Sequence, residues 1–257
     1  MNLDYFLCYD LPVPYKGLNI YPVTVKDYMT FNMCSQSLKI EKNIIPDAKI
    51  ISMSELEYIY YATKNDDATP YLIWFDRLLA LCLKGDDSFN GVGESMKRYA
   101  YDEKGKPVFK IGDIVYDSND FEKIKSIMCE QNLIELVDES ISKEVRDSLD
   151  EARKYKNKLS GTKTASLEDY MISMATATGW TLEYLHSLSI RKFTKAIARL
   201  DNFIHYKIYL SASMSGMVEF KDKSFIKHWL SGLEEKDKYD DVLMDFCLLY
   251  TSDAADE

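Results

Sequence analysis

Residues 71–81 have the sequence YLIWFDRLLAL, the most apolar stretch of helical length in the chain. Pro70 precedes it, and proline suits the first position of a helix because its φ angle is already helical and its missing N–H needs no partner there. A helix that is apolar on nearly all sides has to be buried. The stretch therefore predicts a core helix.

Two more helices are expected on the N-terminal side of this stretch. Thr24 with Asp27, and Ser52 with Glu55, have the three-residue spacing of an N-terminal capping box. Apolar residues at helical spacing follow each box, so that one face of each helix can pack against the core. These residues are Tyr28, Phe31 and Cys34 in the first helix and Leu56, Ile59 and Tyr60 in the second.

Extended structure is expected at the N-terminus. Residues 5–9 (YFLCY) favour a strand, and Pro12 and Pro14 prevent them from continuing as a helix. A turn at residues 15–17 then leads into a short strand at 18–20.

A small sheet is expected in the middle of the chain. Residues 98–101 and 108–111 predict a hairpin around a glycine-containing loop, and 114–116 add a third strand. A three-stranded sheet needs a helix against one face. Ser118 is expected to cap that helix, whose apolar stripe is Phe121, Ile124, Ile127 and Met128.

The C-terminal half is predicted to be helical. Residues 140–158 indicate a mostly solvated helix with a narrow apolar stripe, and 154–163 a flexible linker. Ser166 is expected to cap the next helix and Gly179 to end it. A short helix at 181–188, a long helix capped by Ser189 and a last short helix at 225–233 follow. One side of the long helix is apolar, with Phe193, Ile197, Leu200, Ile204, Ile208 and Ala212.

The expected fold class is therefore mainly α with a small β component: a helical N-terminal part, a short antiparallel meander in the middle and a helical C-terminal part. The parts are 1–95, mostly helical and opening with a short hairpin; 96–136, the meander and its helix; 137–163, the charged helix and linker; and 164–246, a helical C-terminal domain.

Residues 247–256 (CLLYTSDAAD) coincide with the translation of a transposase-based sequencing adapter, TGT CTC TTA TAC ACA TCT GAC GCT GCC GAC. The next two adapter bases, GA, fit the codon of Glu257. We therefore expect residues 247–257 to be an artefact and the natural end of the protein to be missing.

Composition excludes several classes of protein. The formal net charge is −10, or −7 without the three acidic residues of 247–257, and this acidic excess runs along the whole chain, which leaves no basic footprint for nucleic acid. The N-terminus lacks the pattern of a signal peptide, and no stretch approaches the roughly 18 apolar residues that would span a membrane. We expect a soluble intracellular protein.

The natural cysteines are scattered and form no CxxC pair, so we expect them to be reduced thiols. They are Cys8, Cys34, Cys82 and Cys129.

No group of residues predicts catalysis, a cofactor or a metal. Gly91 to Gly93 lacks the third glycine and the preceding strand of a dinucleotide-binding motif. The histidines are outside any HExxH pattern and have no cysteine or carboxylate at ligand spacing. We therefore expect a non-enzymatic protein without cofactors. These histidines are His186, His205 and His228.

The long helix leaves a DNA-binding regulator open as an alternative. Its basic residues follow a short-helix, turn, short-helix pattern that is similar to a helix-turn-helix. Against this, the apolar residues of the same helix need burial and the surrounding chain is acidic, so a solvated face is the simpler interpretation. The basic residues are Arg191, Lys192, Lys195 and Arg199.

Two stretches carry a family resemblance. One is 14–28 (PYKGLNIYPVTVKDY), and the other runs from Leu167 through the long helix to 225–229 (FIKHW). Together they resemble tail assembly chaperones and related tail-module proteins of long-tailed bacteriophages. The resemblance implies a chaperone in the cytoplasm of the infected bacterium, which keeps the tape-measure protein soluble and helps to recruit tail-tube subunits. The chain departs from that family in length and in its meander at 98–116, so a structural virion component, such as a connector or baseplate part, is the alternative.

Such a chaperone needs exposed apolar or aromatic side chains on an acidic body. The candidate partner-binding residues are Tyr206 and Tyr209 on the long helix, with Phe225 and Trp229 after it. Each of these four could instead fill the local core, and the sequence leaves that choice open.

Overall fold

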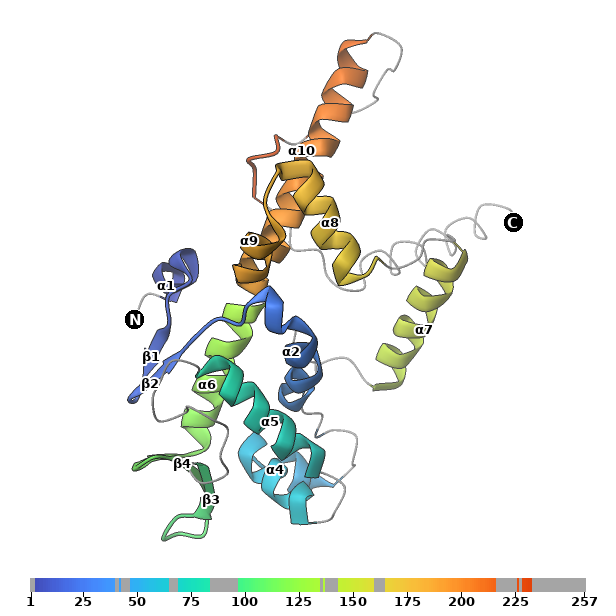
Figure 1. Cartoon of the computed structure of the whole chain (residues 1–257). Coiled ribbons are helices and arrows are strands. Elements are labelled where there is room, and N and C mark those ends of the chain that lie inside the picture. The colour runs from blue at the N-terminus through green and yellow to red at the C-terminus, as the bar shows by residue number, and fades with distance from the viewer. Residues whose placement is uncertain are drawn as a thin grey trace, which may run out of the picture. The chain divides into compact units, whose positions relative to one another are not determined.

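A computed structural model describes residues 3–39, 42, 47–64, 69–83, 97–134, 136, 143–159, 165–215, 226 and 228–232. The fold is mainly helical with two small antiparallel sheets, as the sequence predicts (Figure 1). The chain divides into two compact units, which are described separately: unit 1 holds residues 1–139 and 180–193, and unit 2 holds 140–179 and 194–257. The predicted artefact at 247–257 lies outside the described residues. The domain boundaries expected from the sequence stay a prediction.

The core of unit 1 is organised around α5 (Thr69–Cys82), the helix of the apolar stretch. Phe75, Leu78 and Leu79 on this helix are fully buried. Helices α2 (Tyr28–Cys34) and α4 (Glu55–Lys64) both pack against α5 (Figure 1). Their predicted apolar stripes face the core, with Phe31, Cys34, Leu56, Ile59 and Tyr60 buried and Tyr28 packed against them.

The predicted meander is confirmed. Strands β3 (Lys97–Tyr101), β4 (Pro107–Ile111) and β5 (Ile114–Tyr116) pair antiparallel in that order. Helix α6 (Ser118–Asn132) covers the sheet, and its predicted stripe is buried. The Phe109 ring stacks on Tyr116 with centroids 5.1 Å apart, and these rings join the sheet to the same core.

An N-terminal hairpin is present, with the turn and the second strand where the sequence predicts them, but its first strand lies at 13–15 and not at 5–9. Strands β1 (Val13–Tyr15) and β2 (Leu18–Ile20) pair around the two-residue turn Lys16–Gly17. Both turn residues have positive φ, 41° and 81°, as a hairpin turn of this kind requires.

The prediction of a strand at residues 5–9 is wrong, because these residues form helix α1 (Leu3–Tyr9). The helix buries Leu7 and places Phe6 against the core. It ends at Asp10, whose φ of 55° is left-handed, and the N–H of Leu11 donates to the Phe6 carbonyl. Burial of one helical face against unit 1 has overridden the local preference of aromatic residues for strands.

Three predicted helix starts are displaced. Ser54 rather than Ser52 makes the capping box of α4, with Glu57 as the acid. Asp117 rather than Ser118 caps α6, paired with Asp120. The Thr24 hydroxyl bonds to the Asp27 carboxylate at 3.0 Å and caps no backbone N–H, and a 3-10 turn, Val25–Asp27, precedes α2. The polar residues lie near the predicted starts, but the backbone path decides which of them faces the first turn.

Unit 1 also contains the start of the C-terminal half. Thr181 caps helix α9 (Leu182–Ser187), and the short segment after it pairs with residues 23–25. The N–H of Val25 donates to the Leu188 carbonyl and that of Ile190 to the Val23 carbonyl, both at 2.9 Å. The Ser189 hydroxyl donates to Asp10. These bonds attach the first turn of helix α10 (Ile190–Met214) to unit 1.

Unit 2 contains α7 (Lys143–Leu159), α8 (Leu167–Thr178) and α10 from residue 194 onward. The predicted capping box at Ser166 and the stop at Gly179 are confirmed. Helix α7 continues through the first part of the predicted linker at 154–163, where the structure describes it, which corrects that prediction. The prediction of a last helix at 225–233 is also wrong in its described part, because 228–231 form a turn.

No helix in the described parts of the chain is long and apolar enough to cross a membrane.

Candidate functional site

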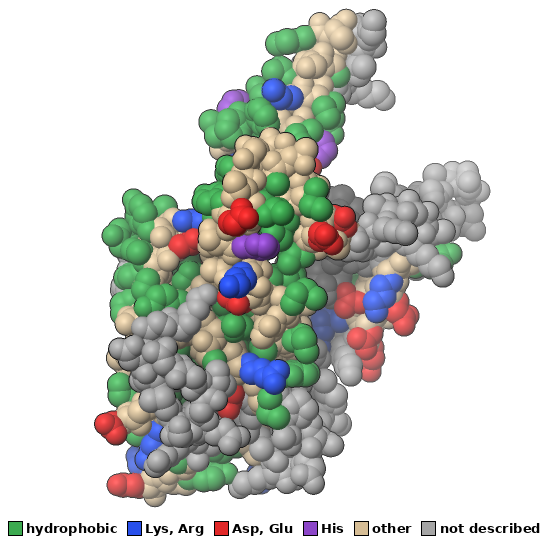
Figure 2. Space-filling model, in the orientation of Figure 1, with side chains coloured by type: hydrophobic (Ala, Val, Ile, Leu, Met, Phe, Trp, Pro, Cys, Tyr) green, Lys and Arg blue, Asp and Glu red, His purple; other side chains and the backbone are tan. Residues whose placement is uncertain are grey.

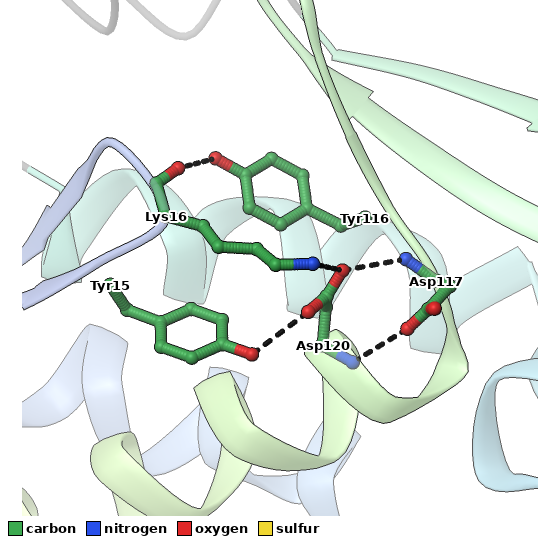
Figure 3. A network of polar contacts seen from close by, with 5 residues as sticks. All are labelled: Tyr15, Lys16, Tyr116, Asp117 and Asp120. Atoms are coloured by element: carbon green, nitrogen blue, oxygen red, sulfur yellow. Dashed lines mark hydrogen bonds and ion pairs between the residues drawn. The ribbon is translucent and has the colours of Figure 1, made fainter.

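A polar network in unit 1 joins the N-terminal hairpin to the start of α6 (Figure 3). The Asp120 carboxylate accepts hydrogen bonds from the Tyr15 hydroxyl at 2.8 Å, the Lys16 ammonium at 2.7 Å and the Asp117 N–H at 3.1 Å. The Tyr116 hydroxyl donates to the Lys16 carbonyl at 2.8 Å. These bonds link the hairpin residues Tyr15 and Lys16 to Asp120 and Tyr116, so we assign the network to holding the hairpin in place.

The pKa shifts agree with this role. Burial raises the pKa of Asp120, but the hydrogen bonds from Lys16, Tyr15 and Asp117 outweigh it, so that the pKa lies below its usual value. Burial, together with the hydrogen bond to Asp120 and its charge, raises the pKa of Tyr15 to about 12. The pair is therefore held as a carboxylate and a neutral phenol, and neither group is poised for proton transfer near neutral pH.

A different kind of surface lies on α10 in unit 2. Successive residues of an α-helix are rotated by about 100°, so Ile197, Ile204 and Ile208 share one side. The Ile197 side chain is half-buried, whereas Ile204 is 45% exposed and Ile208 is 56% exposed. The predicted apolar side of the long helix therefore reaches the surface at these two residues. We call Ile204 and Ile208 the isoleucine stripe.

The opposite side of α10 carries an aromatic cluster. Phe203 contacts Trp229 edge-on with centroids 5.4 Å apart, and Tyr206 contacts His228 at 5.1 Å. The Lys207 ammonium lies over the Phe203 ring at 4.8 Å. Arg199 Nη1 donates to the carbonyls of Trp229 at 3.0 Å and Ser231 at 2.6 Å. The turn 228–231 is thereby held against α10, with Leu230 pointing outward and 63% exposed.

Two of the four predicted partner-binding residues come together in this cluster. Tyr206 and Trp229 are both half-buried and contact the turn and the helix respectively. Tyr209, three residues after Tyr206 on α10, stacks on His205, whose Nδ1 atom lies 3.3 Å from the Asp201 carboxylate. Phe225 lies outside the described residues.

Sequence reasoning missed the isoleucine stripe and Leu230 as surface residues. Helical spacing identified the isoleucines, but the same spacing is usual for a buried face, so it does not distinguish exposed from buried isoleucines. Leu230 had no signal of its own, because its exposure depends on a turn where the sequence predicted a helix.

The basic side chains of α10 bind groups within the protein. Arg191 donates to the Glu130 carbonyl at 2.7 Å, in the last turn of α6, and the Lys192 ammonium lies 3.2 Å from Asp10. Arg199 holds the turn described above. The DNA-binding hypothesis depends on four basic residues, and three of them thus have intramolecular contacts. This argues against contacts between these side chains and phosphates.

The described residues offer no metal centre, because no group of three or more His, Cys, Asp or Glu side chains among them could hold an ion. Figure 2 instead shows hydrophobic side chains on the surface of the part that Figure 1 assigns to α10. The candidate site is therefore an interaction surface: the isoleucine stripe on one side of α10 and the aromatic cluster with its turn on the other.

This surface lies inside a stretch that matches a family model. Residues 156–234 match a family model described as the YomV second domain. The family derives from YomV of Bacillus phage SPBc2, and the match supports a phage origin for this chain. No curated protein and no solved structure matches the chain.

Proposed function

We propose that this chain is a non-enzymatic bacteriophage assembly factor, and that its second unit binds an apolar segment of a partner. The observation that carries the proposal is the exposure of the isoleucine stripe on a helix inside the phage-related region. Full burial of an isoleucine side chain contributes roughly 1.5–3 kcal/mol. The two half-exposed isoleucines on one side of α10 therefore leave apolar surface that a partner can bury with a gain in free energy.

The partner we propose is the tape-measure protein of the same phage, with the chain acting as its chaperone and aiding assembly of the tail tube. A chaperone of this kind has to cover apolar segments of its client while remaining soluble itself. The net charge, −10 for the whole sequence and −7 without residues 247–257, keeps the body soluble, and the isoleucine stripe supplies the contact. The resemblance to tail assembly chaperones suggests this choice of partner, and the match to a phage-derived family supports a phage origin.

Co-expression with the tape-measure protein encoded on the same phage genome tests the proposal. We expect the tape-measure protein to stay in the soluble fraction and to co-purify with this chain. The double variant Ile204→Ser/Ile208→Ser should lose at least tenfold in affinity without unfolding, because both side chains are already about half in water.

Ile51 and Ile73 of unit 1 provide a matched control, since they are 46% and 48% exposed. The variant Ile51→Ser/Ile73→Ser carries the same chemical change at similar exposure and should bind as the unaltered chain does. An insoluble tape-measure protein in the presence of the intact chain would refute the chaperone role. Recovery of the chain as a stoichiometric part of purified virions would favour a connector or baseplate component instead.

A further inference from the structure

Arg199 occupies an unusual position in the interaction surface. Its Nη1 atom donates to two carbonyls of the turn 228–231, those of Trp229 and Ser231, at 3.0 and 2.6 Å. The turn has internal hydrogen bonds as well: the N–H and the hydroxyl of Ser231 donate to the His228 carbonyl at 2.8 and 2.6 Å, respectively. Those bonds shape the turn, but they do not attach it to α10.

Attachment of the turn depends on Arg199 and on ring contacts. The rings of Trp229 and His228 lie against Phe203 and Tyr206, but aromatic contacts at the surface tolerate several arrangements. Two hydrogen bonds from a charged donor to two carbonyls set the direction and the distance of the turn. They also leave Leu230, the residue after Trp229, 63% exposed.

We propose that Arg199 is a positioning residue for partner binding: it fixes the turn on α10 and thereby presents Leu230 and Trp229 as one contact surface. This inference rests on the proposed function for its binding consequence, whereas the positioning itself can be measured without a partner. Leu230 is then a contact residue for the partner, and Arg199 acts through the turn without touching the partner.

The positioning is tested on the full chain labelled with 5-fluorotryptophan. The chain has three tryptophans, which give three fluorine resonances that single Trp→Phe variants assign. Arg199→Met keeps the aliphatic stem and removes the donors, and it should move the Trp229 resonance toward its unfolded position and raise its solvent exposure. Arg199→Lys restores N–H donors and should recover most of the native resonance. Arg191→Met is the matched control, because Arg191 donates to a carbonyl in unit 1 from the same helix and its loss should leave Trp229 unchanged.

Binding to the tape-measure protein is measured in parallel. Arg199→Met and Leu230→Ser should each weaken binding at least tenfold, with Arg199→Lys intermediate and Arg191→Met near the unaltered value. Weaker binding by Arg199→Met with an unmoved Trp229 resonance would mean that Arg199 contacts the partner directly, and would overturn the inference. A moved resonance with unchanged binding would overturn it too, because the turn would then lie outside the surface. If the unaltered chain binds no tape-measure protein, the proposed function fails and the binding part of the inference fails with it, while the resonances still decide the positioning.

Discussion

Replacing Asp120 with Asn should destabilise unit 1 by about 2 kcal/mol at neutral pH. The carboxylate serves three donors through two oxygens, with Tyr15 on Oδ1 and both Lys16 and the Asp117 N–H on Oδ2. Asparagine keeps one oxygen and places an NH2 group, itself a donor, on the other side. If that oxygen remains with Tyr15, the capping of the Asp117 N–H is lost, which costs about 1 kcal/mol. The hydrogen bond from the Tyr15 hydroxyl also becomes weaker, because its acceptor is no longer charged, and this costs about 1 kcal/mol. Lys16 adds little, because its side chain is 51% exposed and can return to water.

The effect should depend on pH with a definite sign. The pKa of Asp120 lies below its usual value in the folded protein, so the carboxylate contributes stability that is fully present above the unfolded pKa of about 3.9. That contribution is lost as the pH falls through the lower folded pKa. The difference between the unaltered chain and Asp120→Asn should therefore be constant from pH 5 to 7 and shrink below about pH 4.

Urea unfolding followed by tryptophan fluorescence measures the effect. With Trp229 replaced by Phe, the remaining tryptophans, Trp74 and Trp180, both lie in unit 1 and report its unfolding. Asp113→Asn makes the same change on an exposed carboxylate nearby and should shift the stability by less than about 0.5 kcal/mol. Equal losses for the two variants, or an Asp120→Asn effect that persists unchanged at pH 2.5, would refute the role assigned to the Asp120 carboxylate.

Two further substitutions test how unit 1 is held together. Gly17→Ala should cost about 1–3 kcal/mol, because a Cβ at φ +81° is strained and would lie 2.6 Å from Ile114 Cδ1; an unchanged urea midpoint would contradict the turn geometry. Tyr60→Phe should cost about 1–3 kcal/mol, since its hydroxyl donates to the Val108 carbonyl and accepts from the Ala100 N–H, and both groups lose this partner. Thermal unfolding of Tyr60→Phe is compared with that of Tyr61→Phe, because Tyr61 is more exposed. Equal melting temperatures for the two variants would exclude a stabilising role for the two hydrogen bonds of the Tyr60 hydroxyl.

Much of the local structure followed from local chemistry. The apolar run at 71–81 predicts a core helix, and Phe75, Leu78 and Leu79 of that helix lie in the unit 1 core, although Ile73 is 48% exposed. The Lys16–Gly17 turn and the capping box at Ser166 are specified by residues within a few positions of each other, and each formed as expected. The same holds for the meander, whose strands are separated by short glycine-containing loops.

The candidate site was less predictable. Tyr206 and Trp229 were identified as aromatic residues of the right kind, but their arrangement depends on Arg199, which lies 30 residues from Trp229 in the chain. Arg199 itself was identified only as part of a basic helix face. Charge and spacing describe what a side chain can bind, while its actual acceptor is set by the path of a distant segment.

The sequence by itself determined most of the helical segments, the three-stranded meander and the apolar stripes, because periodicity, capping residues and turn residues act over a few positions. Only the tertiary structure decided that residues 5–9 are helical and that Asp120 closes a network with a hairpin more than 100 residues away. It also decided that the apolar side of α10 is buried at Phe193 and exposed at Ile208. The physical reason is that an apolar stripe makes burial of one side of a helix favourable, whereas burial itself requires another segment to lie against that stripe.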